Sequence, residues 1–526
     1  MKIITLITII IIIILITNIE AKEKNNSTFK NCIELRKIKL TENNIFSIDE
    51  QNKKFSPFLG KCLYKQLLKE ILDTTSEFYI KNGYITTKPY LKEQNILDGE
   101  IKIVILIGTI EDIVHSETKE SSIKLKTAFI LQNEHILNLR NIETSLESIN
   151  RVPSTNASFE IKPGTSYGKS IIEVKSETST PYHFTFGIDG EKSLSDNNPD
   201  LMGVFSLDNP LGINDIFSFT YNGSRIQREY QSTEGKEFNY SFPLGSFLYE
   251  LIYSDTKYRQ RVEGINKTYI AHGTTDGWKL RISKILNRDQ KNKFTLSAML
   301  HHKDTKNYFE NSLIEVSSYK TTLAQLNLEH LYLQNWGQLF TTYSYYRGED
   351  WLGARSDDYY NIEGNRTSDS ELEFEKYTFN TYLFYYFKDK TYTFDSNFHL
   401  QYTKDKLYYN DQLIVGSKYT VRGYSDTNLY GDNGFYIRNN LTKQFSLNYS
   451  KDYLQTLSLY LGGDYGRIRC TNGNEGNCGK IHSGTVGFKT DSKYLSSNFS
   501  WSRPYKKIKA DPRRNSVFNY SITLKF

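Results

Sequence analysis

The chain has 526 residues, and its 66 Lys and Arg against 60 Asp and Glu give a formal net charge of +6. That surplus is too small, for this length, to predict a nucleic-acid partner. A mean hydropathy of −0.55 excludes a bundle of transmembrane helices. It does not exclude a membrane β-barrel, because barrel strands alternate lipid-facing and lumen-facing side chains. Aromatic residues are abundant, with 40 Tyr and 30 Phe, as the interfacial girdles of a barrel would require.

The first 21 residues predict a secretory signal peptide. Lys2 precedes an almost unbroken apolar run at 3–16, and the small residue Ala21 stands at the expected cleavage site. The alternative is an N-terminal membrane anchor, but the run is shorter than the roughly 20 residues that a spanning helix needs. The mature chain is therefore expected to leave the cytoplasm, with a short segment at 22–31 before the first folded domain.

Four cysteines agree with export into an oxidising compartment. Cys32 and Cys62 flank the start of the first folded segment, and Cys470 and Cys478 bracket a polar loop rich in Gly and Asn. None of them forms the CxxC pair of zinc or thioredoxin-like sites. Two local disulfides, 32–62 and 470–478, are preferred over crossed pairings because each pair lies within one compact segment.

Residues 32–107 and 108–177 predict two small mixed domains, each with the order strand, helix, helix, strand, strand. Apolar residues recur at helical spacing over 63–78 in the first domain and over 142–149 in the second. Strands are expected at 33–40, 84–87, 101–107, 109–115, 158–161 and 170–174. The open edges of such sheets suit the capture of an extended peptide by strand addition, although the domains could also be spacers.

From residue 178 to 526 the sequence predicts an all-β region. Alternating segments of about ten residues are separated by connections rich in Asn, Asp, Gly and Ser. Sixteen antiparallel strands would fit, and they would enclose a lumen wide enough for water or a polypeptide. A soluble β-sandwich is the alternative, but it does not explain the length or the aromatic content. The last strand shows the alternation best, with these residues on one face: Phe518, Tyr520, Ile522, Leu524 and Phe526.

Short motifs in chain order resemble those of one family, the two-partner secretion transporters of the outer membrane, also called TpsB proteins, of the ShlB/FhaC/HecB type. The first and second domains resemble the POTRA domains of that family, and the start of the all-β region resembles its first barrel hairpins. The matching segments are 60–63 (GKCL), 83–88 (GYITTK), 91–94 (LKEQ), 161–164 (IKPG), 167–170 (YGKS), 208–215 (DNPLGIND) and 240–245 (YSFPLG).

The resemblance implies a fold, a place and a function. The fold would be two α+β POTRA domains in the periplasm followed by a transmembrane β-barrel in the bacterial outer membrane. The function would be the secretion of one large cognate exoprotein, of the haemolysin or filamentous-adhesin type, whose secretion domain the POTRA domains capture. Outer-membrane lipid and the barrel-assembly machinery would be further partners. An insertase of the BamA or TamA type and a plain nutrient porin are the alternatives, but the porin leaves the POTRA pair without a purpose.

The segment Val421, Arg422, Gly423 and Tyr424 resembles the VRG(Y/F) tip of a surface loop that folds back into the barrel in this family. The arginine of that loop pairs with an acidic residue on a lumen-facing strand. Strand parity selects Asp464, because Leu457, Leu459 and Leu461 would occupy the opposite face. An Arg can hold a carboxylate through two hydrogen bonds, which Lys cannot copy. The competing interpretation is an ordinary exposed Arg-Gly-Tyr turn.

Three further expectations concern the same lumen. Arg438 should line it. Asn440 stands where relatives often show Glu, so a carboxylate at that point is in doubt. Residues 22–31 leave no room for both the plug helix and the long linker that some family members carry, which gives the inward loop more weight as the stopper of the channel.

Enzymatic chemistry has little support in the sequence. The nine His residues are scattered, and no HExxH motif, GxSxG elbow or P-loop occurs. His301 and His302 are adjacent in a predicted strand, so their side chains should point to opposite faces and not share a metal. Neither a metal nor a cofactor is therefore expected, and the remaining enzyme alternative is a lipid-cleaving outer-membrane phospholipase.

Overall fold

The structure is a computed structural model, and it describes most of the chain from Ile33 onward. The described ranges are 33–43, 45–117, 123–129, 135–192, 199–224, 232–357, 370–387, 390–424, 428–450, 452–471, 477–506 and 516–526. The predicted signal peptide, the segment at 22–31 and Cys32 lie outside them. Contacts divide the chain into one unit of residues 1–81 and 86–107 and a second unit of residues 82–85 and 108–526. Among the described residues, no helix is both long and apolar enough to cross a membrane.

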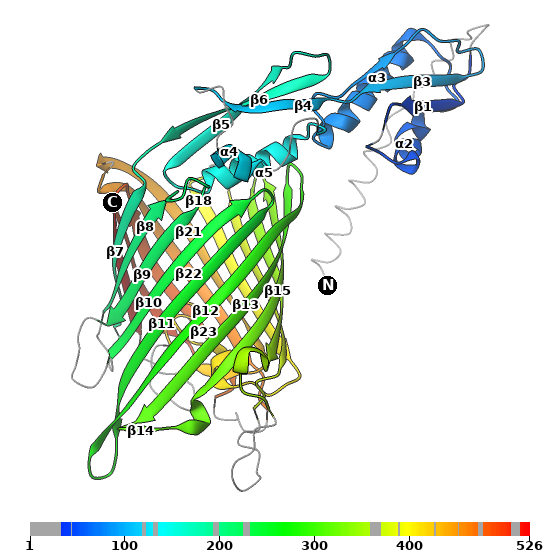
Figure 1. Ribbon diagram of the computed structural model, residues 1–526. Helices are drawn as coiled ribbons and strands as arrows, with labels where there is room; N and C mark the ends of the chain where they lie inside the picture. Colours follow the sequence, from blue (N-terminus) through cyan, green and yellow to red (C-terminus); the bar gives the residue numbers. More distant parts are fainter. Residues whose placement is uncertain are drawn as a thin grey trace, which may run out of the picture. The chain divides into compact units, whose positions relative to one another are not determined.

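The first domain has the predicted order of one strand, two helices and two strands (Figure 1). Its elements are β1 (Lys37–Thr41), α2 (Ile48–Phe55), the short 3-10 helix η1 (Ser56–Phe58), α3 (Lys65–Lys81), β2 (Lys88–Leu91) and β3 (Glu100–Leu106). Strand β3 lies in the middle of the sheet, parallel to β1 and antiparallel to β2. The apolar side of α3, including Leu67 and Ile71, is buried, as are Ile101 and Ile103 of β3. The helical spacing read from the sequence is thus the buried face of α3.

The strand predicted at 84–87 is wrong. Those residues form turns, and β2 begins only at Lys88. After α3, Gly83 has a φ of +92°, a conformation that favours Gly at the end of a helix. Residues 82–85 belong to the second unit, where Ile85 packs against the hydrophobic core of the second domain. Ile85, an apolar residue of the predicted strand, is partly buried against that core instead.

The second domain repeats the plan, with β4 (Thr109–His115), α4 (Ile123–Ala128), α5 (Leu139–Asn150), β5 (Thr155–Pro163) and β6 (Lys169–Thr178). Strand β6 lies between β4 and β5, so β5 and β4 are the edges of this sheet. The Asn138 side chain caps the N-terminus of α5 by accepting a hydrogen bond from the Arg140 backbone. Ile142 and Ile149 of this helix are fully buried against the sheet. The prediction of two βααββ units is confirmed.

Sixteen antiparallel strands within the described ranges close into a barrel (Figure 1). The first eight of its long strands are β7 (Tyr182–Lys192), β8 (Asp200–Asp208), β9 (Ile216–Ser224), β10 (Ser232–Leu244), β11 (Phe247–Glu263), β12 (Thr268–Arg288), β13 (Asn292–Phe309) and β15 (Tyr319–Gln334). The others are β16 (Gly337–Glu349), β17 (Glu375–Tyr386), β18 (Tyr392–Thr403), β21 (Gly434–Ser450), β22 (Leu454–Ile468), β23 (Gly479–Asp491), β24 (Leu495–Pro504) and β25 (Val517–Lys525). The last strand, β25, pairs with the first, β7. The predicted barrel is confirmed.

Short strands and 3-10 helices lie in the connections between the long barrel strands. They are β14 (Ser312–Leu313), η2 (Glu315–Ser317), η3 (Trp351–Gly353), η4 (Tyr409–Asp411), β19 (Leu413–Val415) and β20 (Leu429–Gly431). The second domain contacts one end of the barrel, where Gly245 in the turn between β10 and β11 donates a hydrogen bond to the Thr127 carbonyl oxygen (2.8 Å). We call this the domain end, and we call the opposite end, which holds residues 404–424 and 428–433, the loop end.

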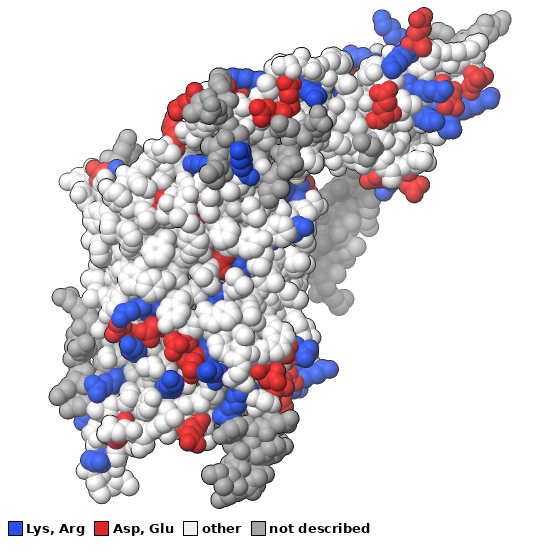
Figure 2. All heavy atoms as spheres, in the orientation of Figure 1, with Lys and Arg blue, Asp and Glu red and all other residues white. Residues whose placement is uncertain are grey.

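Strand parity separates an outer apolar face from a polar lumen. Leu251 of β11 and Leu280 of β12 are direct cross-strand neighbours, and both are exposed on the outside. Their neighbours in sequence, Glu250 and Arg281, form an ion pair on the other face. Figure 2 shows a broad belt of the outer surface with few charged residues, and charged residues gather beyond it toward the loop end. This is the surface that a lipid bilayer requires of a barrel.

Candidate functional site

The connection between β18 and β21 folds into the barrel instead of away from it. Its hairpin of β19 and β20 and the start of the VRGY motif pack on the inner wall, and they form one apolar cluster with strands β22 and β23. The buried members are Leu413, Val415, Val421, Tyr424, Leu429, Ile468 and Ile481. Gly466 on β22 makes this approach possible, because a Cβ there would lie 2.3 Å from Val415 Cγ1.

Arg422 and Asp464 meet in the interior, with side chains only 2% and 0% exposed. The guanidinium donates two hydrogen bonds to the carboxylate, from Nε to Oδ2 (2.7 Å) and from Nη2 to Oδ1 (2.6 Å). The backbone N–H of Arg422 donates a third to Oδ2 (3.0 Å). Such a fork is specific to Arg, and the low polarity of a buried site makes each charge-assisted bond strong. Asp464, the residue predicted from strand parity, is therefore in direct contact with the loop.

The remaining donors of Arg422 reach strand β21. Nη1 donates to Asn440 Oδ1 (2.8 Å), and Nη2 donates to the Asn439 carbonyl oxygen (3.3 Å). On β22, a Cβ at Gly462 would lie 2.3 Å from Arg422 Nη2, so only Gly leaves room for the guanidinium. The guanidinium is thus satisfied from two neighbouring strands. This matters because an unpaired donor here would carry the full cost of desolvation.

Asn440 places an amide beside the Arg422 guanidinium. Its Nδ2 donates to Asp395 Oδ2 on β18 (2.8 Å), so a carboxylate is present one strand further along the wall. Sequence reasoning missed Asp395, although the parity of β18, on which Leu400 is exposed outside, would have placed it inside.

Gly423, Tyr424 and Arg438 attach the rest of the motif to the wall. Gly423 has a φ of +89°, and a Cβ would lie 3.1 Å from the Pro504 nitrogen on β24. The Tyr424 hydroxyl bonds the carbonyl oxygens of His482 (3.1 Å) and Lys506 (3.0 Å). Arg438 lies opposite Asp464 in the register of β21 and β22, but its Nη1 donates to the carbonyl oxygen of the loop residue Lys418 (2.7 Å). The VRGY motif thus contacts the four consecutive strands β21, β22, β23 and β24.

Of the two predicted disulfides, the described residues include both cysteines of 470–478 and only one cysteine of 32–62. Cys470 and Cys478 form a disulfide with a Cα–Cα distance of 5.1 Å. Cys478 packs against the apolar cluster of the loop, and its neighbour Asn477 accepts a hydrogen bond from the Tyr430 backbone on β20 (3.0 Å). Cys62 is disulfide-bonded, whereas Cys32 lies outside the described residues.

The residues predicted on one face of the last strand point outward on β25. Phe518, Ile522, Leu524 and Phe526 are exposed, and Tyr520 is half-buried. They belong to the outer surface of the joint between β25 and β7, away from the loop.

A second cluster joins the second domain to the domain end of the barrel, and sequence reasoning missed its key residue, Arg151. Its guanidinium donates to Ser241 Oγ (2.8 Å) in the YSFPLG motif and to the Asn214 carbonyl oxygen (2.7 Å) in the DNPLGIND motif. Asp208 Oδ2 accepts from the Ser154 backbone (2.7 Å). Burial lowers the pKa of Arg151 from its ordinary value. The two motifs are thus the barrel's contact surface for this domain.

Glu147 of α5 extends this joint. It forms ion pairs with Lys293 (2.6 Å) and with Arg288, at the turn between β12 and β13. Partial burial raises the pKa of Glu147, but hydrogen bonds and charge attraction from the two cations outweigh it. The net pKa lies below the ordinary 4.5.

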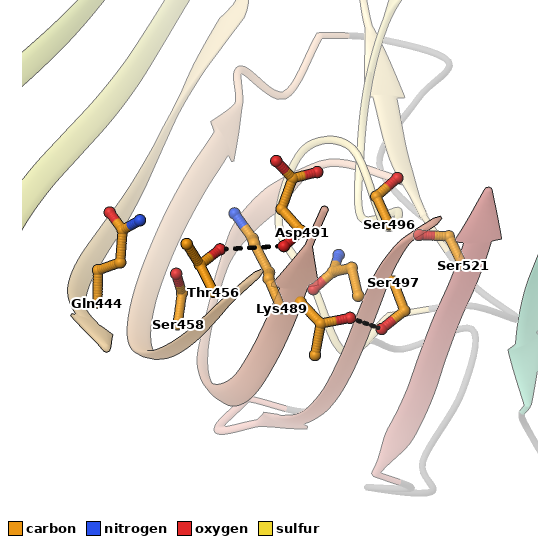
Figure 3. A pocket seen from close by; sticks show the side chains of 10 residues that line it. Gln444, Thr456, Ser458, Lys489, Asp491, Ser496, Ser497 and Ser521 are labelled. Carbon is orange, nitrogen blue, oxygen red and sulfur yellow. Dashed lines mark hydrogen bonds between the residues drawn. The ribbon is translucent and has the colours of Figure 1, made fainter. Parts of the chain in front are cut away.

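Between the buried pair and the domain end, the lumen wall is hollowed by a cavity of about 360 Å³ (Figure 3). Hydroxyl and amide side chains dominate its lining, which consists of Gln444, Thr456, Ser458, Lys489, Thr490, Asp491, Ser496, Ser497, Asn498 and Ser521. Such groups both donate and accept, so this wall can hydrogen-bond a peptide backbone of any sequence. In the described part of the chain, no group of three His, Cys, Asp or Glu is arranged to hold a metal ion.

Known proteins resemble this chain over nearly its whole length. The family model of the haemolysin secretion/activation protein ShlB/FhaC/HecB matches residues 168–490, a ShlB-type POTRA model matches 33–108 and another POTRA model matches 109–163. The outer membrane transporter CdiB of Dickeya dadantii is 27% identical over 469 residues, which cover 88% of this chain and 81% of that protein.

Two further likenesses agree. The hemolysin transporter protein ShlB of Serratia marcescens is 28% identical over 420 residues, or 79% of this chain and 72% of that protein. The solved structure of CdiB from Escherichia coli superposes with a TM-score of 0.85 at 25% identity and covers 97% of this chain and 93% of that one.

Arg422→Ala should destabilise the barrel by about 3–5 kcal/mol, because it leaves the Asp464 carboxylate buried without a partner. Urea unfolding of the detergent-solubilised protein, followed by Trp fluorescence, measures the loss. The double variant Arg422→Met/Asp464→Leu removes both charges and should recover part of that stability. Equal stability of the single variant and the parent would contradict the role of this pair.

The Glu147 ion pairs should make the joint sensitive to acid. Because the folded pKa is lowered, their contribution is complete above the ordinary value of 4.5 and is lost as the pH falls through the lower folded value. Glu147→Gln should therefore lower the melting temperature more at pH 7 than at pH 3. The effect should be about 1 kcal/mol or less, since the side chain is 42% exposed. A difference that persists unchanged at pH 3 would refute this.

Proposed function

The chain belongs to the haemolysin secretion/activation protein family ShlB/FhaC/HecB, and from this membership we propose that it exports a large cognate exoprotein from the periplasm to the cell surface by two-partner secretion. It is an outer-membrane protein whose POTRA domains lie in the periplasm. The exoprotein would be of the haemolysin or adhesin type. The domain end of the barrel then faces the periplasm, and the loop end faces the outside.

One observation carries the proposal: the loop between β18 and β21 is fixed inside the barrel lumen by the buried pair of Arg422 and Asp464. A barrel with a fixed inner stopper suits conditional passage better than free diffusion. We propose that the loop moves aside when a polypeptide passes, so that opening is coupled to the arrival of the substrate.

The first proposed step is capture in the periplasm. Strands β1 and β2 are the edges of the first sheet, and β4 and β5 are the edges of the second. An unfolded secretion domain could add a strand at one of these edges through backbone hydrogen bonds. Capture by backbone groups would accept a long and variable polypeptide.

The second proposed step is threading. The joint of Arg151 and Glu147 holds the second POTRA domain at the barrel mouth, so that a captured chain is delivered to the lumen. The wall of Figure 3 offers hydroxyl and amide partners along the way. The sequence has no nucleotide-binding P-loop, and we propose that folding of the exoprotein outside the cell drives its passage.

Two other activities fit this chain less well. The similarity to transporters favours secretion over insertion of other barrels, the work of an insertase. We further propose that the chain is a conduit and not an enzyme such as a phospholipase, and that it meets outer-membrane lipid and, during its own biogenesis, the barrel-assembly machinery.

Export is tested in a strain that lacks this protein and expresses the exoprotein encoded beside it. The parent protein should release the exoprotein into the medium, and Arg422→Ala should reduce that release while still reaching the membrane. Glu234→Gln, which alters an exposed ion pair with Lys236 on the outer face, should export normally. Immunoblots of medium and periplasm measure the outcome, with a periplasmic marker to exclude lysis.

The result also separates the alternatives. Retention of the exoprotein in the periplasm despite folded parent protein would refute secretion. Accumulation of unassembled porins in the strain that lacks the protein would support the insertase instead.

A further inference from the structure

The inward loop also contacts the first strand of the barrel, β7, in addition to the strands β21, β22, β23 and β24 that the VRGY motif contacts. Lys418 Nζ lies 2.8 Å from Asp189 Oδ2 on β7, and the Tyr419 hydroxyl lies 3.5 Å from the same oxygen. The two residues of the ion pair are 229 positions apart in sequence. Their side chains are 19% and 38% exposed, so the pair is partly shielded from water.

Lys418 contacts two strands of the barrel wall, β21 as well as β7. Its carbonyl oxygen accepts the hydrogen bond from Arg438 on β21, while its ammonium group reaches Asp189 on β7. Strands β22, β23, β24 and β25 separate β21 from β7 in the barrel. Since Arg422 is anchored on β22, the loop is fastened to the wall on both sides of β25.

The joint between β25 and β7 differs from every other contact between long neighbouring strands in the described barrel. The other neighbours follow one another along the chain, whereas these two are its first and last strands. The strand register joins eight residue pairs, 518–525 with 185–192, and Phe526 exchanges two further backbone hydrogen bonds with Phe184. No local connection links the two strands. The ion pair of Lys418 and Asp189 crosses this joint on the lumen side, and it therefore restrains two strands that no hairpin connects.

We infer that Lys418 and Asp189 form a second ion pair that positions the inward loop across the closing joint of the barrel, and that this pair must open before the loop can clear the lumen. The pair closes the barrel more firmly while the loop is inside. Its partial exposure allows water to replace either partner, so it can break at a much lower cost than the buried pair. The part of the inference that concerns transport rests on the proposed export function, whereas the part that concerns the closed state does not.

The closed state is tested by electrical recording in planar bilayers, which needs no exoprotein. Asp189→Asn keeps the size of the side chain but removes its charge, and openings should become roughly 2- to 5-fold more frequent. The charge exchange Lys418→Asp/Asp189→Lys should return the frequency toward that of the parent. Electrophoretic mobility with and without heating shows that each variant is folded.

A matched control lies elsewhere on the lumen wall. Arg281 and Glu329 form a lumenal ion pair of similar exposure between barrel strands, with no part of the loop involved (2.6 Å; 33% and 20%). Glu329→Gln should leave the opening frequency at the parental level. If Asp189→Asn behaves like Glu329→Gln, or if the charge exchange restores nothing, the second ion pair does not position the loop.

The transport step is tested by locking the pair. In the variant Lys418→Cys/Asp189→Cys, a short bifunctional maleimide joins the two positions, and export of the exoprotein should then fall at least tenfold. The same variant without the cross-linker must export, and its failure would count against the proposed function and not against the lock. Normal export by the cross-linked protein would overturn the inference that this contact has to open.

Discussion

The buried pair of Arg422 and Asp464 is the constraint on which the inner architecture depends. Two full charges placed away from water are tolerated only if each donor and acceptor finds a partner in good geometry. The fork on Asp464 and the amide of Asn440 supply such partners, and Gly462 leaves the space for them. The loop therefore has one position in the lumen. A shift of one residue along β22 would place the guanidinium against the opposite parity of the strand.

The contacts at the two ends of the barrel differ in how far they are shielded from water. At the loop end, an apolar cluster around Val421 excludes water and so strengthens the charged contact beside it. At the domain end, Arg151 and Glu147 lie at a partly solvated surface and use several modest hydrogen bonds and ion pairs. The first arrangement favours a state that is either fully closed or fully released. The second favours a durable attachment that remains in place while the loop moves.

The side of the barrel wall on which a residue lies could be predicted from the sequence, because side chains along a strand alternate with a period of two. That rule was enough to place Asp464 inside and the leucines of β22 outside, and motif order was enough to indicate the domains. It failed where contacts depend on how the barrel closes. Nothing local in the sequence relates Lys418 to Asp189, or Arg151 to Ser241, since these pairs arise from strand order and docking. The strand expected at 84–87 failed for a similar reason, because Ile85 packs, partly buried, against the core of the neighbouring domain.

The unequal burial of the two ion pairs imposes an order on any release of the loop. The pair of Lys418 and Asp189 is partly exposed, so water can stabilise its separated charges as they part. Arg422 and Asp464 are almost completely buried, and their separation leaves two desolvated charges until the whole tip has moved. The loop therefore loosens first at β7 and last at β22. A polypeptide that enters from the domain end meets a stopper whose weaker attachment yields before its stronger one, so an encounter too brief to displace the tip leaves the lumen closed.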